Sequence, residues 1–230
     1  MHPRFFFAGC LVLMTVFYVT TAAVADGSDV ALPKPRVKGD VSVEAALAAK
    51  YTERNFKATK ISLLEISQLL WSANGNLPTD AVTGATTKVQ GSAGGLYPLE
   101  IFLVTGQGTV EGTPAGVFSY DPSGNKLRSV ASGDKRTLLA HAAHSQMWLA
   151  RAPAVVVVAA EKQRTMSRYG PQGEIYVHME AGASGQCLCL QAAGLGLKTG
   201  TIGAFVDARV SAVLELPSQI TPYLLVGVGR

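Results

Sequence analysis

The chain has 230 residues, of which 48% are hydrophobic, and it carries a formal net charge of +4. A chain of this length and composition buries a sizeable core, which excludes a largely disordered protein. Because lysines and arginines are mixed with aspartates and glutamates rather than gathered in a basic run, no nucleic-acid partner is expected.

An uncharged apolar segment comes first along the chain. Residues 5–25 carry no charge, and A-V-A at 23–25 before Asp26 has the small-x-small form of a signal-peptidase site. We therefore predict that residues 1–25 are an export signal and that the domain lies outside the cytoplasm, in the periplasm. The apolar run is also long enough to span a bilayer. A membrane anchor formed by uncleaved residues 5–25 is the alternative, and only then would the membrane be a partner.

Short apolar or β-branched runs predict the strands. The run Ala154–Val158 has no polar alternation, so we expect a strand that is buried on both faces. A turn at 121–125 joins two of the other runs into a hairpin. The remaining predicted strands cover 99–104, 116–120, 126–130 and 223–228.

Helical signals lie between these strands. Ser62 and Glu65 have the spacing of a capping box, so a helix is predicted over 62–73. A long helix over 174–197 has only small residues at 181–185. Because glycine in a helix costs about 1 kcal/mol relative to alanine, we expect another helix to approach closely there, such as one from a second subunit. Further helices are predicted over 134–149 and 207–214.

Strands and helices therefore interleave, but the strands are few and one pair forms a hairpin. This pattern indicates an α+β fold rather than a doubly wound parallel sheet. We expect one domain at 46–230, preceded by an exposed leader at 26–45 that contains prolines and a glycine.

Familiar catalytic motifs find no support in the sequence. The glycines at 106–112 and 194–200 miss the spacing of a dinucleotide fingerprint by one residue. Neither Ser92 nor Ser184 lies in a G-x-S-x-G motif, which disfavours serine acyl transfer. If the protein is an enzyme, a cofactor is expected to carry the difficult chemistry.

Two further pairs of side chains are candidates for a metal site or a disulfide. His141 and His144 lack a third spaced ligand, so no metal site is predicted. Cys187 and Cys189 are separated by one residue and show no zinc spacing. This favours two small core side chains and leaves a disulfide open.

Several motifs occur in the order that is found in the nitroreductase superfamily. They are ISLLEISQLLWSANG, GSAGGLYPLEIFLV, GVFSYDP, RYG, EAG and GLGLKTGTIGAF. On these motifs the chain resembles the SagB-type dehydrogenases of that superfamily over about 49–230, and GSAGGLYP is the most specific of them. The resemblance implies an α+β homodimer with a central, mostly antiparallel sheet flanked by helices, and with FMN bound at the subunit interface.

The resemblance assigns a glycine-rich loop to the flavin ring. Ser92, Ala93, Gly94, Gly95 and Leu96 would lie along the isoalloxazine, where side chains would collide and backbone amides can donate hydrogen bonds. A plain turn before a strand is the alternative for this loop.

A second group of cofactor residues follows from K-Y-T-E-R at 50–54, which looks like the family's Arg-Arg-Ser-x-Arg motif. Lys50 and Thr52 would hold the phosphate. Arg54 would lie at the pyrimidine edge of the ring, where negative charge gathers on reduction. Tyr51 completes the set but stands where the family has a cation, which puts the phosphate affinity in question.

The C-terminal part supplies the last candidates. Ile202, Gly203 and Ala204 match the loop that approaches the reactive nitrogen of the flavin, and Arg230 follows the final strand, where relatives often carry a phosphate-binding arginine.

The pair Arg168-Tyr169 stands where azoline-oxidising relatives have Lys-Tyr, which assists proton removal. Arg168 stays protonated at any working pH and cannot be that base, so azoline oxidation is disfavoured. Tyr169 is a candidate for donating or orienting, with a structural role as the alternative.

The first functional hypothesis is therefore an exported FMN-dependent oxidoreductase that exchanges hydride with an unidentified small substrate, while Arg54 and the loop amides stabilise the reduced flavin. The second is a flavin-binding or dimeric scaffold protein that has lost catalysis, which the departures at Tyr51 and Arg168 favour. The sequence leaves the substrate and the electron donor open.

Overall fold

The structure, a computed structural model, describes residues 29–79 and 87–230. The predicted export signal at 1–25 lies outside the described residues. Among the residues that are described, no helix combines the length and the apolar character that crossing a membrane requires.

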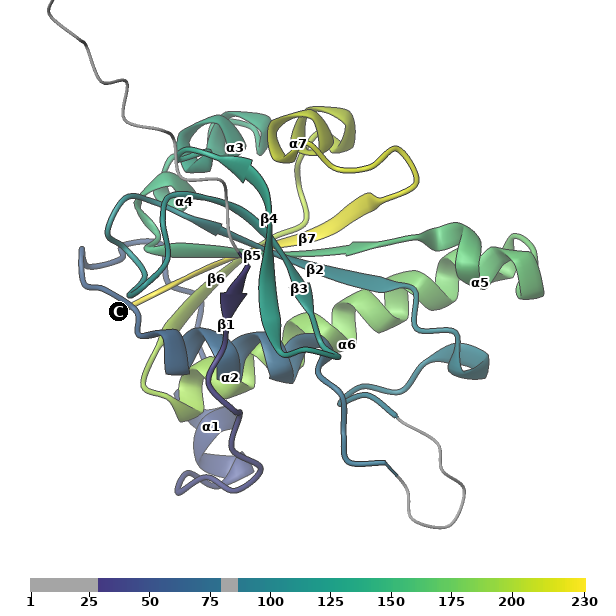
Figure 1. Cartoon of the computed structure of the whole chain (residues 1–230), viewed down its shortest axis with the longest axis horizontal. Coiled ribbons are helices and arrows are strands. Elements are labelled where there is room, and N and C mark those ends of the chain that lie inside the picture. The colour runs from purple at the N-terminus through teal and green to yellow at the C-terminus, as the bar shows by residue number, and fades with distance from the viewer. Residues whose placement is uncertain (1–28, 80–86) are drawn as a thin grey trace, which may run out of the picture.

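Within the described residues, seven strands form one sheet in the order β1-β4-β3-β2-β5-β7-β6 (Figure 1). All neighbouring strands in it are antiparallel. This confirms the α+β class with a mostly antiparallel central sheet. The strands are β1 (Val30–Ala31), β2 (Leu99–Thr105), β3 (Gly116–Asp121), β4 (Lys126–Ser132), β5 (Ala154–Ala160), β6 (Lys198–Ile202) and β7 (Thr221–Gly229).

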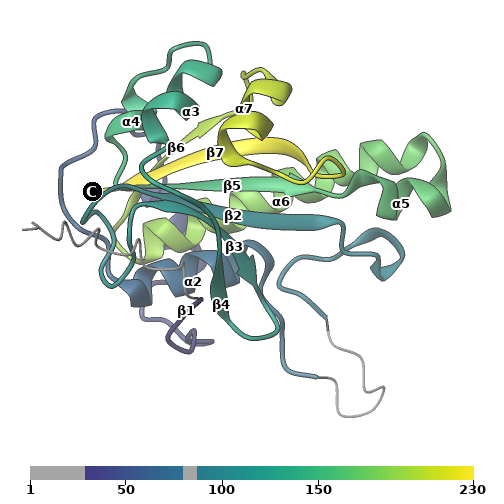
Figure 2. The same cartoon turned by 45° about the horizontal axis from the view of Figure 1, so that its top comes forward.

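Helices cover both faces of the sheet. Figure 2 shows α3, α4 and α7 on one side of it and α2 and α6 on the other. The helices are α1 (Val43–Ala49), α2 (Leu63–Asn74), α3 (Arg136–Ala142), α4 (Trp148–Arg151), α5 (Lys162–Tyr169), α6 (Gln172–Gly194) and α7 (Asp207–Leu214), with a 3₁₀ turn η1 at Ala93–Gly95.

The central strand β5 is buried on both faces, as its sequence predicts. Val156 packs in one core cluster with Leu69 of α2 and Leu188 of α6. Its neighbour Val157 packs in the other cluster, with Leu139 of α3. Because successive side chains of a strand point to opposite faces, a run of valines serves both layers.

Helix α2 begins as its capping box predicts. The Glu65 amide donates to Ser62 Oγ at 3.2 Å, and the Ser62 amide donates to Glu65 Oε2 at 2.8 Å. The helix ends at Asn74, with Gly75 as its cap. Local chemistry thus fixes both ends of this element.

Three helical expectations need correction. The single helix expected at 134–149 is two short helices, α3 and α4, because His144 (φ 53°) and Ser145 (φ 58°) adopt the left-handed conformation and interrupt it. The long helix runs from Gln172 to Gly194 rather than over 174–197. The helix α5 just before it was not expected.

Some of the small residues in the middle of α6 pack against other elements of the chain, and others face solvent. Ser184 Oγ donates to the carbonyl of Ala73 on α2 at 2.7 Å. A Cβ on Gly185 would lie 2.3 Å from Leu224 Cδ2, so this glycine lets β7 approach the helix. Gly182 and Ala183, in contrast, are exposed. The close approach predicted for this patch is therefore made in part within one chain.

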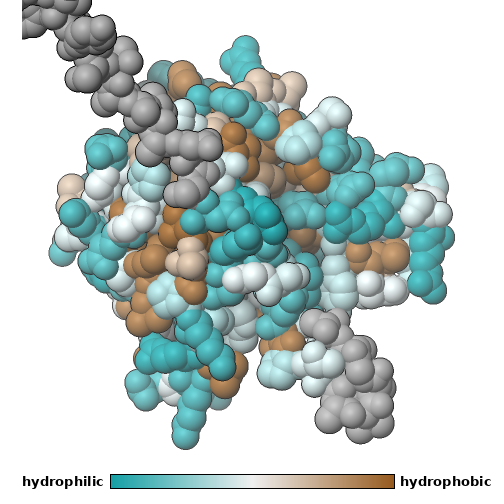
Figure 3. Space-filling view, in the orientation of Figure 1, coloured by the Kyte–Doolittle hydropathy of each residue, from teal (hydrophilic) through white to brown (hydrophobic). Residues whose placement is uncertain are grey.

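The expected leader is exposed only in part. Residues 36–45 are exposed, but Val30 and Ala31 pair with β4, and Leu32 is buried in the core. The expectation of a wholly exposed leader is wrong at its start, because an edge strand covers the end of the sheet. Elsewhere on the face seen in Figure 3, hydrophilic and hydrophobic residues are interspersed.

Candidate functional site

The glycine-rich loop before β2 is held by a buried carboxylate. Glu180 of α6 accepts hydrogen bonds from the Ala93 amide at 2.9 Å and from Ser92 Oγ at 3.1 Å. Ser92 Oγ in turn accepts from the Tyr97 amide at 2.8 Å. Glu180 belongs to the EAG motif, but the sequence alone does not indicate this role, because its partners lie almost ninety residues away.

The tip of this loop adopts a backbone that favours glycine. Gly94 has φ 61° and Gly95 has φ 67°, both in the left-handed region. A Cβ on Gly94 would lie 2.7 Å from the Tyr169 hydroxyl and 3.0 Å from Arg168 Nη1. A Cβ on Gly95 would meet no atom within 4 Å. The structure therefore brings the loop and the Arg168-Tyr169 pair together.

The pair is supported by neighbouring rings. The Arg168 guanidinium lies 5.5 Å from the centroid of the Tyr169 ring, and Tyr169 meets Tyr176 edge to face at 5.2 Å. These contacts give the end of α5 a defined arrangement beside the loop.

The segment 50–54 lies along the outer edge of the sheet. Thr52 forms a parallel bridge with Thr199 of β6, and the Glu53 amide donates to the Thr199 carbonyl at 2.8 Å. A Cβ on Gly200 would lie 2.3 Å from the Glu53 carbonyl oxygen. Gly200 is thus required for this close pairing.

Two side chains of the segment 50–54 form cation–π contacts with residues of other elements. Arg54 Cζ lies 5.9 Å from the centroid of Trp148, and Lys198 Nζ lies 4.3 Å from the centroid of the exposed Tyr51. Lys198 therefore places a cation beside Tyr51, where the family motif has an arginine. Trp148 of α4 and Lys198 of β6 were not predicted as part of this site from the sequence.

Glu53 organises the backbone of the same segment. Its carboxylate accepts from the Asn55 amide at 2.7 Å and from the Arg54 amide at 2.8 Å. These two backbone hydrogen bonds lower the pKa of Glu53. The side chain is thus a turn-forming acceptor, and Arg54 is left with no carboxylate partner among the described residues.

The residues Ile202, Gly203 and Ala204 stand at the end of β6. Ile202 is buried, whereas Gly203 and Ala204 are exposed, and a Cβ on Gly203 would meet no atom within 4 Å. The Ala204 carbonyl accepts from Gln146 Nε2 at 3.4 Å. Because 50–54 runs beside β6, the structure brings these two predicted groups together.

Arg230 is engaged within the chain. Its Nη1 donates to the Lys60 carbonyl at 2.8 Å, and its Nη2 forms an ion pair with Glu65. The Lys57 amide donates to the Arg230 carbonyl. A phosphate at Arg230 would therefore compete with Glu65.

The loop at 92–96 and the residues along β6 lie apart in one chain. The loop leads into β2, and β5 and β7 lie between β2 and β6. At about 4.8 Å between strands, this separates the two groups by about 14 Å across the sheet alone. Among the residues that the structure describes, no hydrogen bond or ion pair joins them.

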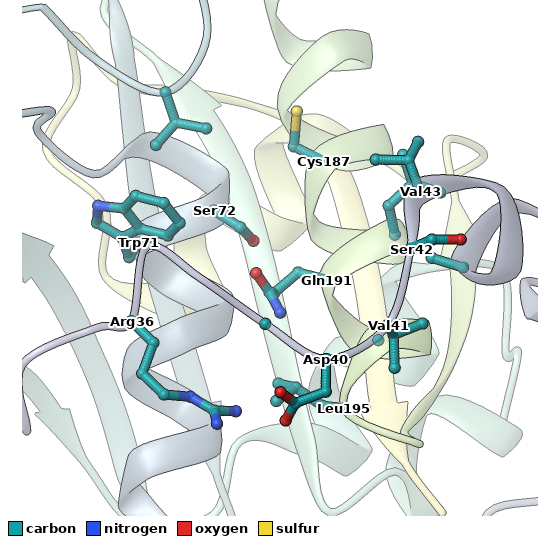
Figure 4. Close-up of a pocket in the computed structure, with 15 residues that line it drawn as sticks. Arg36, Asp40, Val41, Ser42, Val43, Trp71, Ser72, Cys187, Gln191 and Leu195 are labelled. Atoms are coloured by element: carbon teal, nitrogen blue, oxygen red, sulfur yellow. The ribbon is translucent and has the colours of Figure 1, made fainter.

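A separate hollow lies between the leader, α2 and α6. It has a volume of about 350 Å³, and Trp71, Val43, Cys187 and Gln191 line it (Figure 4). None of the predicted flavin residues is among its lining residues. Burial raises the pKa of the Cys187 thiol.

Cys187 and Cys189, the cysteines in the described part of the chain, are unbonded. Cys189 is buried, as expected, but Cys187 is only half-buried and faces the hollow, so the expectation of two core side chains holds for Cys189 alone. In the described part of the chain, no group of three or more histidines, cysteines and carboxylates could hold a metal ion.

Comparison with known proteins decides the family. A model described as the nitroreductase family matches residues 47–230. The chain belongs to the nitroreductase family. A relative from Methanocaldococcus jannaschii, which is itself described as a nitroreductase, is 35% identical to this chain over 191 residues. The alignment covers 83% of this chain and 92% of the relative. Membership of the family supports a flavin-dependent oxidoreductase.

Solved nitroreductase structures share the fold. One from Ralstonia eutropha has a TM-score of 0.72 at 21% identity and covers 90% of this chain and 92% of its own. The NADPH:FMN oxidoreductase of Vibrio harveyi, complexed with NAD+, has a TM-score of 0.55 at 19% identity and covers 82% of this chain and 68% of its own. At these identities the likeness concerns the fold alone.

Proposed function

We propose that this nitroreductase-family protein is an FMN-dependent oxidoreductase of the SagB type, which exchanges hydride between the flavin and a small substrate. The observation that carries the proposal is that the backbone faces open space at two glycines, Gly95 and Gly203. A Cβ on Gly95 or on Gly203 would meet no atom within 4 Å, so the chain faces open space there without side chains. A flat ring needs such close backbone approach.

The other residues present fit the rest of the cofactor. Lys50 and Thr52 would hold the phosphate, beside the additional cation of Lys198. Arg54 would face the pyrimidine edge, since its guanidinium lies over Trp148 with no carboxylate partner in the described chain. The Vibrio harveyi neighbour is an NADPH:FMN oxidoreductase, which supports this choice of flavin.

A homodimer would complete the site. The loop at 92–96 and the β6 residues are too far apart to share one ring within a chain, so the loop of one copy would meet β6 of another. Exposed apolar side chains are available for such contact. On α6, Ile175 is 47% and Met179 is 65% exposed, next to the exposed Gly182.

The chain's own residues have separate tasks in this proposal. Flavin, when bound, supplies the exchange of hydride. The Arg54 guanidinium would stabilise negative charge at the ring edge. The Tyr169 hydroxyl, beside Gly94, would donate a hydrogen bond to the substrate or orient it. Because Arg168 cannot accept a proton, azoline oxidation is disfavoured.

A second candidate function is a flavin-binding or dimeric scaffold without catalysis. Two observations favour it: the Arg230 guanidinium is already engaged by Glu65, and Tyr51 occupies the place of a further cation. Weaker phosphate binding would follow from both.

The test is the visible absorption of the domain 26–230, purified after addition of FMN and removal of the excess, and then reduced without oxygen. Flavin bands that bleach and recover with an added acceptor support the oxidoreductase. Retained flavin without turnover supports the scaffold. A colourless folded protein contradicts the oxidoreductase and favours a dimeric scaffold that has lost the cofactor.

We also propose that the protein is exported to the periplasm after cleavage following Ala25, with an uncleaved anchor at 5–25 as the alternative. The support is the uncharged segment and its A-V-A site. Cell fractionation and N-terminal sequencing test this. A mature protein that begins at Asp26 in the soluble periplasmic fraction is the expected result, and a full-length cytoplasmic protein would contradict it.

A further inference from the structure

One cation of helix α5 lies beside the loop and forms no ion pair in the described part of the chain. Helix α5 carries three cations, and two of them are paired. Lys162 binds Glu174 at 2.9 Å, and Arg164 binds Glu161 at 2.6 Å. The third, Arg168, is exposed and forms no ion pair among the described residues.

This guanidinium nevertheless has a defined place. It lies against the Tyr169 ring, which Tyr176 contacts in turn. Its Nη1 would be 3.0 Å from a Cβ on Gly94, so it touches the tip of the loop where a side chain is missing. The space beyond, at Gly95, is open.

Among the described residues around the loop, the carboxylates are engaged, and Lys88 Nζ lies 5.5 Å from the centroid of the Tyr97 ring. Glu180 is occupied by Ser92 and Ala93. Glu100 and Glu161 both bind Arg164. Arg168 thus lies beside the loop, and among the described residues no hydrogen bond or ion pair occupies its guanidinium. Arginine presents a planar fork of donors that matches a carboxylate in a bidentate manner.

We infer that Arg168 binds a carboxylate on the substrate and holds it at the Gly94-Gly95 tip. The inference rests on the proposed function, in which this loop borders the flavin, and it names the substrate class as a small carboxylic acid. Arg168 then selects the substrate by charge, in a position where a lysine could have served as a base.

The experiment measures binding of a matched pair of probes to the purified protein by ¹⁹F NMR. The probes are 4-fluorobenzoate and 4-fluorobenzamide, which have similar shapes and differ in charge. We expect the benzoate to bind at least about tenfold more tightly than the amide. In Arg168→Gln this preference should vanish, while Arg168→Lys should retain part of it, because charge remains without the fork.

Lys162→Gln is the matched control, since it removes one positive charge from the same helix at a residue outside the site. It should leave the preference intact. Equal binding of both probes to the unmodified protein, or an unchanged preference in Arg168→Gln, would overturn the inference.

Failure of the proposed function gives a different result. Flavin bands with no carboxylate preference would leave the oxidoreductase standing and remove the inference. A colourless protein that still prefers the benzoate through Arg168 would support the carboxylate site and contradict the proposed flavin-dependent function. The NMR measurement does not require the cofactor, so it reads out in either case.

Discussion

The Glu180 carboxylate accepts a hydrogen bond from the backbone amide of Ala93 at 2.9 Å. The same oxygen accepts from Ser92 Oγ at 3.1 Å. Glu180 is only 7% exposed, so α6 fixes the start of the glycine-rich loop from within the core. A residue far from the loop in sequence thereby positions the backbone that we expect to face the flavin.

Removal of this carboxylate should loosen the loop. In Glu180→Ala, the Ala93 amide and the Ser92 hydroxyl lose their acceptor, and a hydrogen bond to a charged group contributes about 1.5–3 kcal/mol. The dissociation constant of FMN, measured by quenching of flavin fluorescence, should rise at least about tenfold. Glu180→Gln keeps an acceptor oxygen and should lose less. Equal FMN affinity in all three proteins would contradict this role.

Gly94→Val should abolish flavin binding and leave the fold largely intact. The new side chain meets the Tyr169 hydroxyl and Arg168 at a left-handed backbone, and these neighbours are at the surface of α5 rather than in the core. Circular dichroism should be unchanged while the yellow colour is lost. Gly91→Ala is the control, because its Cβ would meet nothing within 4 Å. A yellow Gly94→Val protein would refute the placement of the loop.

The exposed face of α6 predicts the oligomeric state. In Gly182→Leu, the added side chain meets no atom of its own chain within 4 Å of its Cβ but would obstruct a second copy. We expect light scattering to show a dimer for the unmodified protein and mostly monomer for this variant. Ala208→Leu adds the same side chain to the exposed surface of α7 and should remain dimeric. A monomeric unmodified protein would rule out the shared site.

The buried Tyr120 and the half-buried Tyr223 should respond differently to loss of the hydroxyl. Tyr223 OH has no hydrogen-bond partner among the described residues, whereas Tyr120 OH donates to Asn125 Oδ1 at 3.1 Å. Tyr223→Phe should therefore leave the free energy of unfolding unchanged or raise it. Tyr120→Phe should lower it by about 1 kcal/mol. Urea unfolding at pH 7 compares the free energies of unfolding of the two variants. A larger decrease for Tyr223→Phe than for Tyr120→Phe would contradict the prediction.

The same tyrosines predict a loss of stability at alkaline pH. Burial raises the pKa of Tyr223 to about 12 and that of Tyr120 to about 12. Tyrosine in an unfolded chain titrates near 10. Because the folded pKa is the higher one, the stability from each phenol is fully present below about pH 10 and is lost as the pH rises towards about 12. Tyr223→Phe should reduce this loss of stability at alkaline pH. Identical profiles of unfolding free energy against pH for the unmodified protein and this variant would contradict the prediction.

Local chemistry explains what the sequence predicted correctly. The capping box of Ser62 and Glu65 lies within four residues, and the valines of β5 need only a sheet with two covered faces. The family motifs assign the loop at 92–96 and the segment at 50–54 to a cofactor. Their assignment to FMN stays a prediction that the absorption experiment tests.

Contacts between distant segments decided the rest. The left-handed break at His144 and Ser145 depends on how α3 and α4 pack, because no glycine marks it. Strand β6 exists because Lys198–Ile202 pairs with β7, and a five-residue run with a glycine carries little strand signal of its own.

The sequence by itself thus determined the fold class, the main elements and the family, since these rest on periodicity and on contiguous motifs. Only the tertiary structure revealed that Glu180 holds Ala93, that Glu65 engages Arg230, and that Arg168 has no partner of opposite charge in the described chain. The physical reason is that hydrogen bonds and ion pairs act over a few ångströms in space. Residues that are far apart in the chain form them only once the sheet and helices have brought them together.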